Sequence, residues 1–69
     1  MIVLDCLGQR CPLPVIALAK RIRDVGVGEI VRVLADDPAA ANDIRAWCRM
    51  KEQEFLAENG TALDIRKVS

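Results

Sequence analysis

Residues 29–38 have the sequence Glu-Ile-Val-Arg-Val-Leu-Ala-Asp-Asp-Pro, and this stretch decides the architecture of the chain. The run from Glu29 to Ala35 is β-branched and apolar, which predicts a central strand. Asp37 and Pro38 then form a typical helix start, with Asp37 as the N-cap and Pro38 as the first helical residue. A helix is therefore expected from Pro38 to about Lys51.

The chain after this point predicts one helix and then a hairpin. The helix has one apolar stripe, made of Ala41, Ile44, Trp47 and Cys48. Residues 54–57 and 62–66 form two short alternating patterns on either side of Asn59-Gly60. An Asn-Gly pair between two strand patterns is a strong hairpin signal, so we expect two antiparallel strands.

The chain before the central strand predicts a strand and a helix. Residues 2–5 are a short apolar run suited to a strand, and residues 7–10 form the loop that leaves it. From Pro12 the apolar residues follow a helical period: Val15, Leu18, Ala19, Ile22 and Val25. Gly26 stands where a glycine commonly ends a helix.

The predicted order is β-α-β-α-β-β over a single domain, residues 1–69. The first β-α-β unit should cross over right-handed between parallel strands, which places both helices on one face of the sheet. We therefore expect an α/β fold: a two-layer α/β sandwich with a four-stranded mixed sheet, both helices on one face.

The composition predicts an aliphatic core and excludes several functions. The chain is 52% hydrophobic but has one Trp, one Phe and no Tyr. Ten basic residues balance ten acidic ones, which argues against a nucleic-acid-binding face. Without His, there is no His-based acid/base chemistry, no Cys-His pair and no Cys/His zinc site. We expect no cofactor and no metal.

Cysteine usage predicts a reducing compartment. Three cysteines are an odd number, and no secretory signal pattern precedes them. The longest apolar run, residues 13–19, is too short to cross a membrane. We expect a cytoplasmic protein with reduced thiols and no membrane association.

Residues 10–14, Arg-Cys-Pro-Leu-Pro, hold the strongest candidate for chemistry. If Pro12 is the first helical residue, Cys11 is the N-cap, where a thiolate or persulfide would face the positive end of the helix dipole. Pro12 and Pro14 have no N–H, which leaves only Cys11 and Leu13 as backbone donors. The motif is thus expected to position the sulfur rigidly more than to activate it.

The sequence resembles the TusA/SirA family of sulfur carriers along nearly its whole length. The matching residues are Leu4-Asp5, Gly8, Arg10-Cys11-Pro12-x-Pro14-Val15, Lys20, Gly28-Glu29, Val33, Asp36-Asp37-Pro38, Asp43-Ile44, Cys48, Glu54 and Ile65-x-Lys67. The resemblance departs at Arg45, where the family often has Pro, and at residues 51–53, where it often has Gly and His.

The resemblance implies the same two-layer fold and a persulfide carried on Cys11. It implies a cysteine desulfurase or a rhodanese-like protein as sulfur donor, and an acceptor protein in tRNA thiolation, molybdenum-cofactor or sulfur-oxidation pathways. The activity implied is a sulfurtransferase-type relay rather than turnover of a small-molecule substrate. We expect a monomer that forms transient complexes.

The other candidate residues have simpler expected roles. Cys6 and Cys48 are expected to pack in the core, with Cys6 also a candidate second thiol for Cys11. Arg10 is a loop charge that could stabilise the anionic sulfur. Lys20 and the pair Asp36 and Asp37 are candidates for partner docking, although capping already explains Asp37.

Two other functions are consistent with parts of the sequence. A dithiol redox protein or thiol sensor would use Cys6 and Cys11, but their spacing is not that of a Cys-x-x-Cys enzyme. An RNA-binding module is conceivable for a small sandwich, but the zero net charge and lack of an aromatic platform argue against it.

Overall fold

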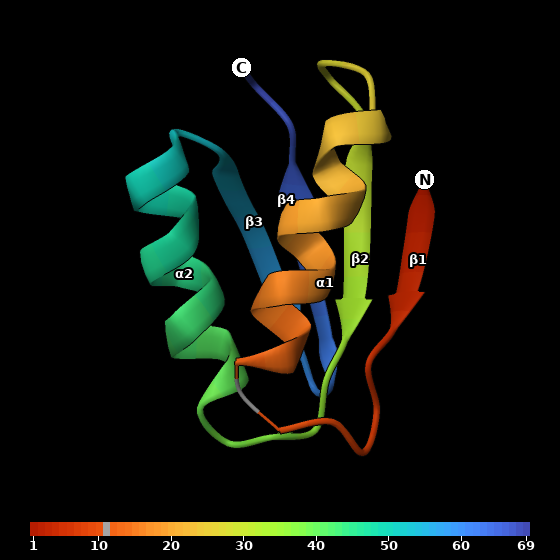
Figure 1. Cartoon of the computed structure of the whole chain (residues 1–69), viewed down its shortest axis with the longest axis vertical. Helices are drawn as coiled ribbons and strands as arrows, with labels where there is room; N and C mark the ends of the chain where they lie inside the picture. Colours follow the sequence, from red (N-terminus) through yellow and green to blue (C-terminus); the bar gives the residue numbers. More distant parts are fainter. Residues whose placement is uncertain (11) are drawn as a thin grey trace.

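The structure, a computed structural model, describes residues 1–10 and 12–69 and has the predicted architecture. The elements are β1 (Ile2–Asp5), α1 (Leu13–Arg21), a 3₁₀ turn η1 (Ile22–Asp24), β2 (Ile30–Leu34), α2 (Ala40–Lys51), β3 (Glu54–Asn59) and β4 (Ala62–Arg66). The sheet order is β1-β2-β4-β3, with β1 parallel to β2 and the other two pairs antiparallel. Both helices cover the same face of this sheet (Figure 1).

Strict alternation along the two central strands builds the core. Val31 and Val33 of β2 pair with Ile65 and Leu63 of β4, and all four side chains are buried towards the helices. Leu18 of α1 packs in the same cluster without exposed surface. As predicted, the core is aliphatic apart from Trp47 and the two thiols Cys6 and Cys48.

Helix α1 differs from the prediction at both ends. It begins at Leu13, and Pro12 (φ −95°, ψ 17°) is the N-cap, so the prediction of Pro12 as the first helical residue with Cys11 as the cap was wrong. At the other end, η1 tightens the chain and Val25 is extended. The left-handed glycine of this turn is Gly28 (φ +93°) and not Gly26.

A lysine from the far end of the chain closes this first helical segment. The Lys67 ammonium donates to the carbonyl of Ile22 over 2.9 Å. A cation is favourable at a helix C-terminus, where carbonyl groups lack helical partners. The Ile22 carbonyl thus accepts both the Val25 N–H, over 3.2 Å, and the Lys67 ammonium, and the helical segment ends before Gly26.

Helix α2 begins two residues later than predicted. The side chain of Asp37 accepts the N–H of Ala39 at 2.8 Å, and its carbonyl accepts that of Ala40 at 3.0 Å. Asp37 therefore organises a turn ahead of the helix, and Ala39 is the N-cap. Ala40 replaces the predicted Ala41 as the fully buried first member of the apolar stripe, while Ile44, Trp47 and Cys48 are buried as predicted.

The hairpin is present but its turn lies one residue further on. Asn59 is the last residue of β3 and pairs with Ala62, so the two-residue loop is Gly60-Thr61. Gly60 has φ +58°, as expected when the glycine occupies the first central position of a II′-type turn. β3 runs beyond the predicted residues 54–57 to Asn59, and it has a bulge between Phe55 and Ala57.

The sheet face away from the helices has an ion pair at its centre. Arg32 and Asp64 lie opposite each other on β2 and β4 and form two hydrogen bonds, of 2.8 and 3.0 Å. The hydrogen bonds from Arg32 lower the pKa of the Asp64 carboxyl, while partial burial opposes this shift. The ion pair makes this face of the sheet polar at its centre and links β2 to β4 through side chains.

This pair predicts a stability change at acid pH. Because the folded pKa of Asp64 lies below its unfolded value of about 4, its stabilisation is present above that pH and is lost as the pH falls through the folded pKa. Asp64→Asn should therefore melt below the wild type at about pH 6, with the gap closing towards about pH 2. Thermal melts of both proteins, with Asp24→Asn as the exposed control, measure this gap; a gap that does not change with pH would contradict it.

Candidate functional site

Two loops meet at one edge of the sheet and form the candidate site. Since β1 and β2 are parallel, their carboxyl ends lie side by side. Residues 6–10 leave β1 there, and residues 35–39 leave β2 at the same edge (Figure 1). The predicted site residues Arg10, Pro12, Asp36 and Asp37 therefore belong to one region.

The first loop is fixed by its backbone amides. The N–H of Leu7 donates to the carboxylate of Asp5 over 3.1 Å, and that of Gln9 to the carbonyl of Cys6 over 3.1 Å. The N–H of Gly8 donates to the Asp36 carboxylate over 3.0 Å. Gly8 has φ +79°, a left-handed conformation that glycine adopts without strain.

Cys11, the predicted sulfur-bearing residue, lies outside the described residues, but both of its neighbours are placed. Arg10 and Pro12 are exposed. The N–H of Leu13 donates to the carbonyl of Arg10 over 2.8 Å. Leu13 was expected to be a free donor at the helix start, and this expectation was wrong because the turn uses its N–H.

The two prolines of the motif have different environments. Pro14 is a fully buried residue in the first turn of α1, whereas Pro12 is exposed and lines a groove. Leu13 stands between them with half of its surface (52%) exposed. One proline thus anchors the start of the helix in the core, and the two residues before it are exposed.

The other two thiols are buried, as predicted. Cys6 follows β1 and Cys48 lies on α2, each with only 2% of its surface exposed. Burial raises the pKa of the Cys48 thiol to about 11. Burial and the nearby Asp5 carboxylate raise the pKa of Cys6. Neither thiol is therefore a ready nucleophile at neutral pH.

An apolar groove beside Pro12 was not predicted from the sequence. It has a volume of about 290 Å³ and is lined by Pro12, Val15, Asp43, Ala46, Trp47 and Met50. Met50 is 70% exposed, and Ile16 adds a further exposed apolar side chain on α1. Ile16 and Met50 lie off the buried stripes of their helices, and that is the signal that could have indicated this surface.

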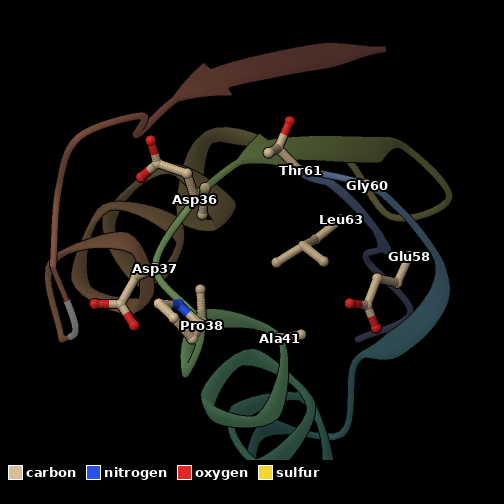
Figure 2. Close-up of a pocket in the computed structure, with 10 residues that line it drawn as sticks. Asp36, Asp37, Pro38, Ala41, Glu58, Gly60, Thr61 and Leu63 are labelled. Carbon is tan, nitrogen blue, oxygen red and sulfur yellow. The ribbon is translucent and has the colours of Figure 1, made fainter.

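A second pocket, of about 180 Å³, lies between the β2–α2 loop and the hairpin turn. Figure 2 shows Asp36 and Asp37 on one side and Glu58 on the other, with Leu63 between them. Among residues 1–10 and 12–69, no group of three or more Cys, Asp or Glu side chains is placed to hold a metal ion. The same residues include no helix long and apolar enough to cross a membrane.

Arg45 has contacts that the sequence did not reveal, whereas Lys20 lies on the surface as expected. Arg45 lies 4.8 Å from the centre of the Phe55 ring and pairs with Glu58 at 2.8 Å, which ties α2 to β3. Arg45 therefore helps to hold one wall of the pocket in Figure 2. Lys20 is exposed near the far end of α1, so the fold does not bring it to residues 6–10.

The family of the chain follows from a comparison with known proteins. A family model described as Sulfurtransferase TusA matches residues 2–67. The chain belongs to the TusA family. This TusA-family chain is also similar to the crystal structure of a SirA-like protein from Desulfitobacterium hafniense, with 29% sequence identity over 94% of this chain and 92% of that one, and a TM-score of 0.73. Members of the family act as sulfur carriers and interact with sulfur donor and acceptor proteins.

The buried thiols predict selective labelling. Cys11 should react with iodoacetamide at neutral pH at least about tenfold faster than Cys6 or Cys48, because burial raises the pKa of the latter two. Peptide mapping after timed alkylation measures the three rates. Cys48→Ala should keep the fast reaction and Cys11→Ser should lose it; equal labelling of Cys6 and Cys11 would refute the prediction.

Proposed function

We propose that this TusA-family protein carries sulfane sulfur as a persulfide on Cys11. The Cys11 thiolate attacks the outer sulfur of a donor persulfide, the donor S–S bond breaks, and the donor leaves as a thiolate. The proton stays on the transferred sulfur, and no net oxidation or reduction occurs. An acceptor thiolate then attacks the same terminal sulfur and releases Cys11.

The observation that carries this proposal is the way the chain on both sides of Cys11 is held. Residues 7–9 each donate their amide within the fold, and the Leu13 N–H closes back onto Arg10. A helix N-terminus favours an anion by only about 0.3–1 kcal/mol. With Leu13 engaged and two prolines without N–H groups, few donors remain to activate the sulfur. Position is what this motif supplies.

The buried second thiol favours a carrier over a dithiol redox protein. A resolving cysteine must form a thiolate and reach its partner. Cys6 is buried and its pKa is raised, so it is a poor resolving residue for Cys11. The absence of a resolving thiolate suits a residue that must keep its sulfur until a partner arrives.

We propose that partners dock on the apolar groove beside Pro12. The groove is lined by Pro12 of the motif and by Met50, which is exposed. Exposed apolar patches of this kind commonly mark sites of protein association. The donor would be a cysteine desulfurase or a rhodanese-like protein, and the acceptor a protein of tRNA thiolation, molybdenum-cofactor or sulfur-oxidation pathways. The carrier would act in the cytoplasm as a monomer, with Lys20, Asp36 and Asp37 as further candidate contacts.

Sulfur loading can be tested by mass spectrometry. After incubation with a cysteine desulfurase and cysteine, the intact protein should gain about 32 Da, the mass of one sulfur atom, and dithiothreitol should remove it. Cys11→Ser should show no gain, whereas Cys48→Ala should load like the wild type. Uptake of sulfur by Cys11→Ser would disprove the proposed role.

The docking surface can be tested with a matched pair of variants. Met50→Glu should slow loading from the desulfurase by about tenfold, because it places a charge in the apolar groove, but should leave loading from inorganic polysulfide unchanged. Val27→Glu is the control: Val27 is also 70% exposed, and it lies in the loop before β2, at the opposite end of that strand from the site. Equal loading rates for both variants would place docking elsewhere.

A further inference from the structure

Among the described residues, the carboxylate of Asp36 joins the loop before Cys11 to the loop after β2. Cys6 makes the last backbone bond to β2, with its N–H donating to the Leu34 carbonyl over 2.8 Å. Beyond it, the amides of Leu7 and Gln9 donate to Asp5 and Cys6, which belong to the same segment. Such local bonds shape the loop but do not fix where it lies relative to the body of the protein.

Asp36 makes the one long-range hydrogen bond that the structure records for residues 7–10. Its carboxylate accepts the Gly8 N–H over 3.0 Å, across 28 positions of the sequence. Asp36 directly follows Ala35, which is 6% exposed and whose own N–H donates to the Thr61 carbonyl over 2.9 Å. The carboxylate therefore extends from a well-anchored backbone.

The conformation of Gly8 makes this contact specific. With φ +79°, Gly8 turns the chain in a way that most residues avoid. No atom lies within 4 Å of the position that a Cβ would take, so the requirement for glycine comes from the backbone angle and not from crowding. A substitution at Asp36 therefore removes the acceptor without altering the residue at the turn, and a substitution at Gly8 disfavours the turn without removing the acceptor.

We propose that Asp36 is a positioning residue for Cys11: its hydrogen bond to Gly8 fixes the loop, and so the place from which the sulfur is handed to and from protein partners. This inference rests on the proposed sulfur-carrier function. It gives Asp36 a role beyond partner docking. It requires an acceptor oxygen at this place and does not require a negative charge.

The test compares Asp36→Ala with Asp36→Asn, which keeps an acceptor oxygen and removes the charge. In Asp36→Ala, the Gly8 amide should exchange with solvent faster, and loading of Cys11 from a cysteine desulfurase with cysteine should slow by about tenfold, because misplacing a reacting group by a small distance is costly. Alkylation of Cys11 by iodoacetamide, which needs no docking, should stay within about twofold of the wild type. Asp36→Asn should restore both the Gly8 protection and the loading rate.

Two further variants separate this role from other effects. Glu58→Ala removes a carboxylate from the same pocket but leaves the loop bond intact, so it should load like the wild type. Gly8→Ala keeps Asp36 but disfavours the turn, and it should slow loading as Asp36→Ala does; it carries the test if Asp36→Ala does not fold.

The outcomes distinguish this inference from the proposed function. If the wild type takes up no sulfur on Cys11, the carrier function fails, while Gly8 exchange in the two Asp36 variants still decides whether Asp36 holds the loop. If the wild type loads and Asp36→Ala loads equally fast, the positioning role is overturned. Loading by Asp36→Asn that is as slow as by Asp36→Ala would also overturn it, because charge would then be the cause.

Discussion

The parallel pairing of β1 with β2 is the constraint on which the site depends. Parallel neighbours must be joined by a crossover, and here the crossover is α1 with its 3₁₀ turn. The same pairing places the loop after β1 beside the loop after β2. Only because of this can Asp36 accept the amide of Gly8. The topology of the sheet thus brings the loop before Cys11 and the loop after β2 together.

The site combines little electrostatic activation with firm placement. The amide of Leu13 is used within the turn, and the prolines on either side of it contribute no N–H. Pro14 is buried and ties the start of α1 to the core. A residue that exchanges sulfur between proteins needs a reproducible location, since each partner must bring its own sulfur into line with it.

Much of the fold could be predicted, because the hydrophobic periods of β2, α1 and α2 are strong. The errors lie at the ends of elements, where turns and tertiary contacts decide the boundary. Gly26 looked like a helix terminator, but the segment ends in a 3₁₀ turn, and its Ile22 carbonyl accepts the Val25 N–H and the ammonium of Lys67, 45 residues away. The hairpin turn is Gly60-Thr61 and not Asn59-Gly60, because Asn59 still pairs with Ala62.

The sequence motif of the candidate site could be predicted, but its neighbours in space could not. The motif at residues 10–14 predicts Cys11 as the sulfur-bearing residue, but neither the groove beside Pro12 nor the bond between Gly8 and Asp36 has a local sequence signature. Both arise from residues that are far apart in the chain and that the sheet brings together.

The burial of Cys6 and Cys48 has a consequence for the lifetime of the loaded protein. Burial raises the pKa of Cys48 to about 11 and also raises the pKa of Cys6, so both thiols stay protonated at neutral pH. A terminal sulfur on Cys11 would therefore meet almost no internal nucleophile able to strip it off as sulfide and leave a disulfide behind. Burial of the two thiols in the core therefore slows the intramolecular loss of sulfur, so that the persulfide would last until an external thiol reacts with it.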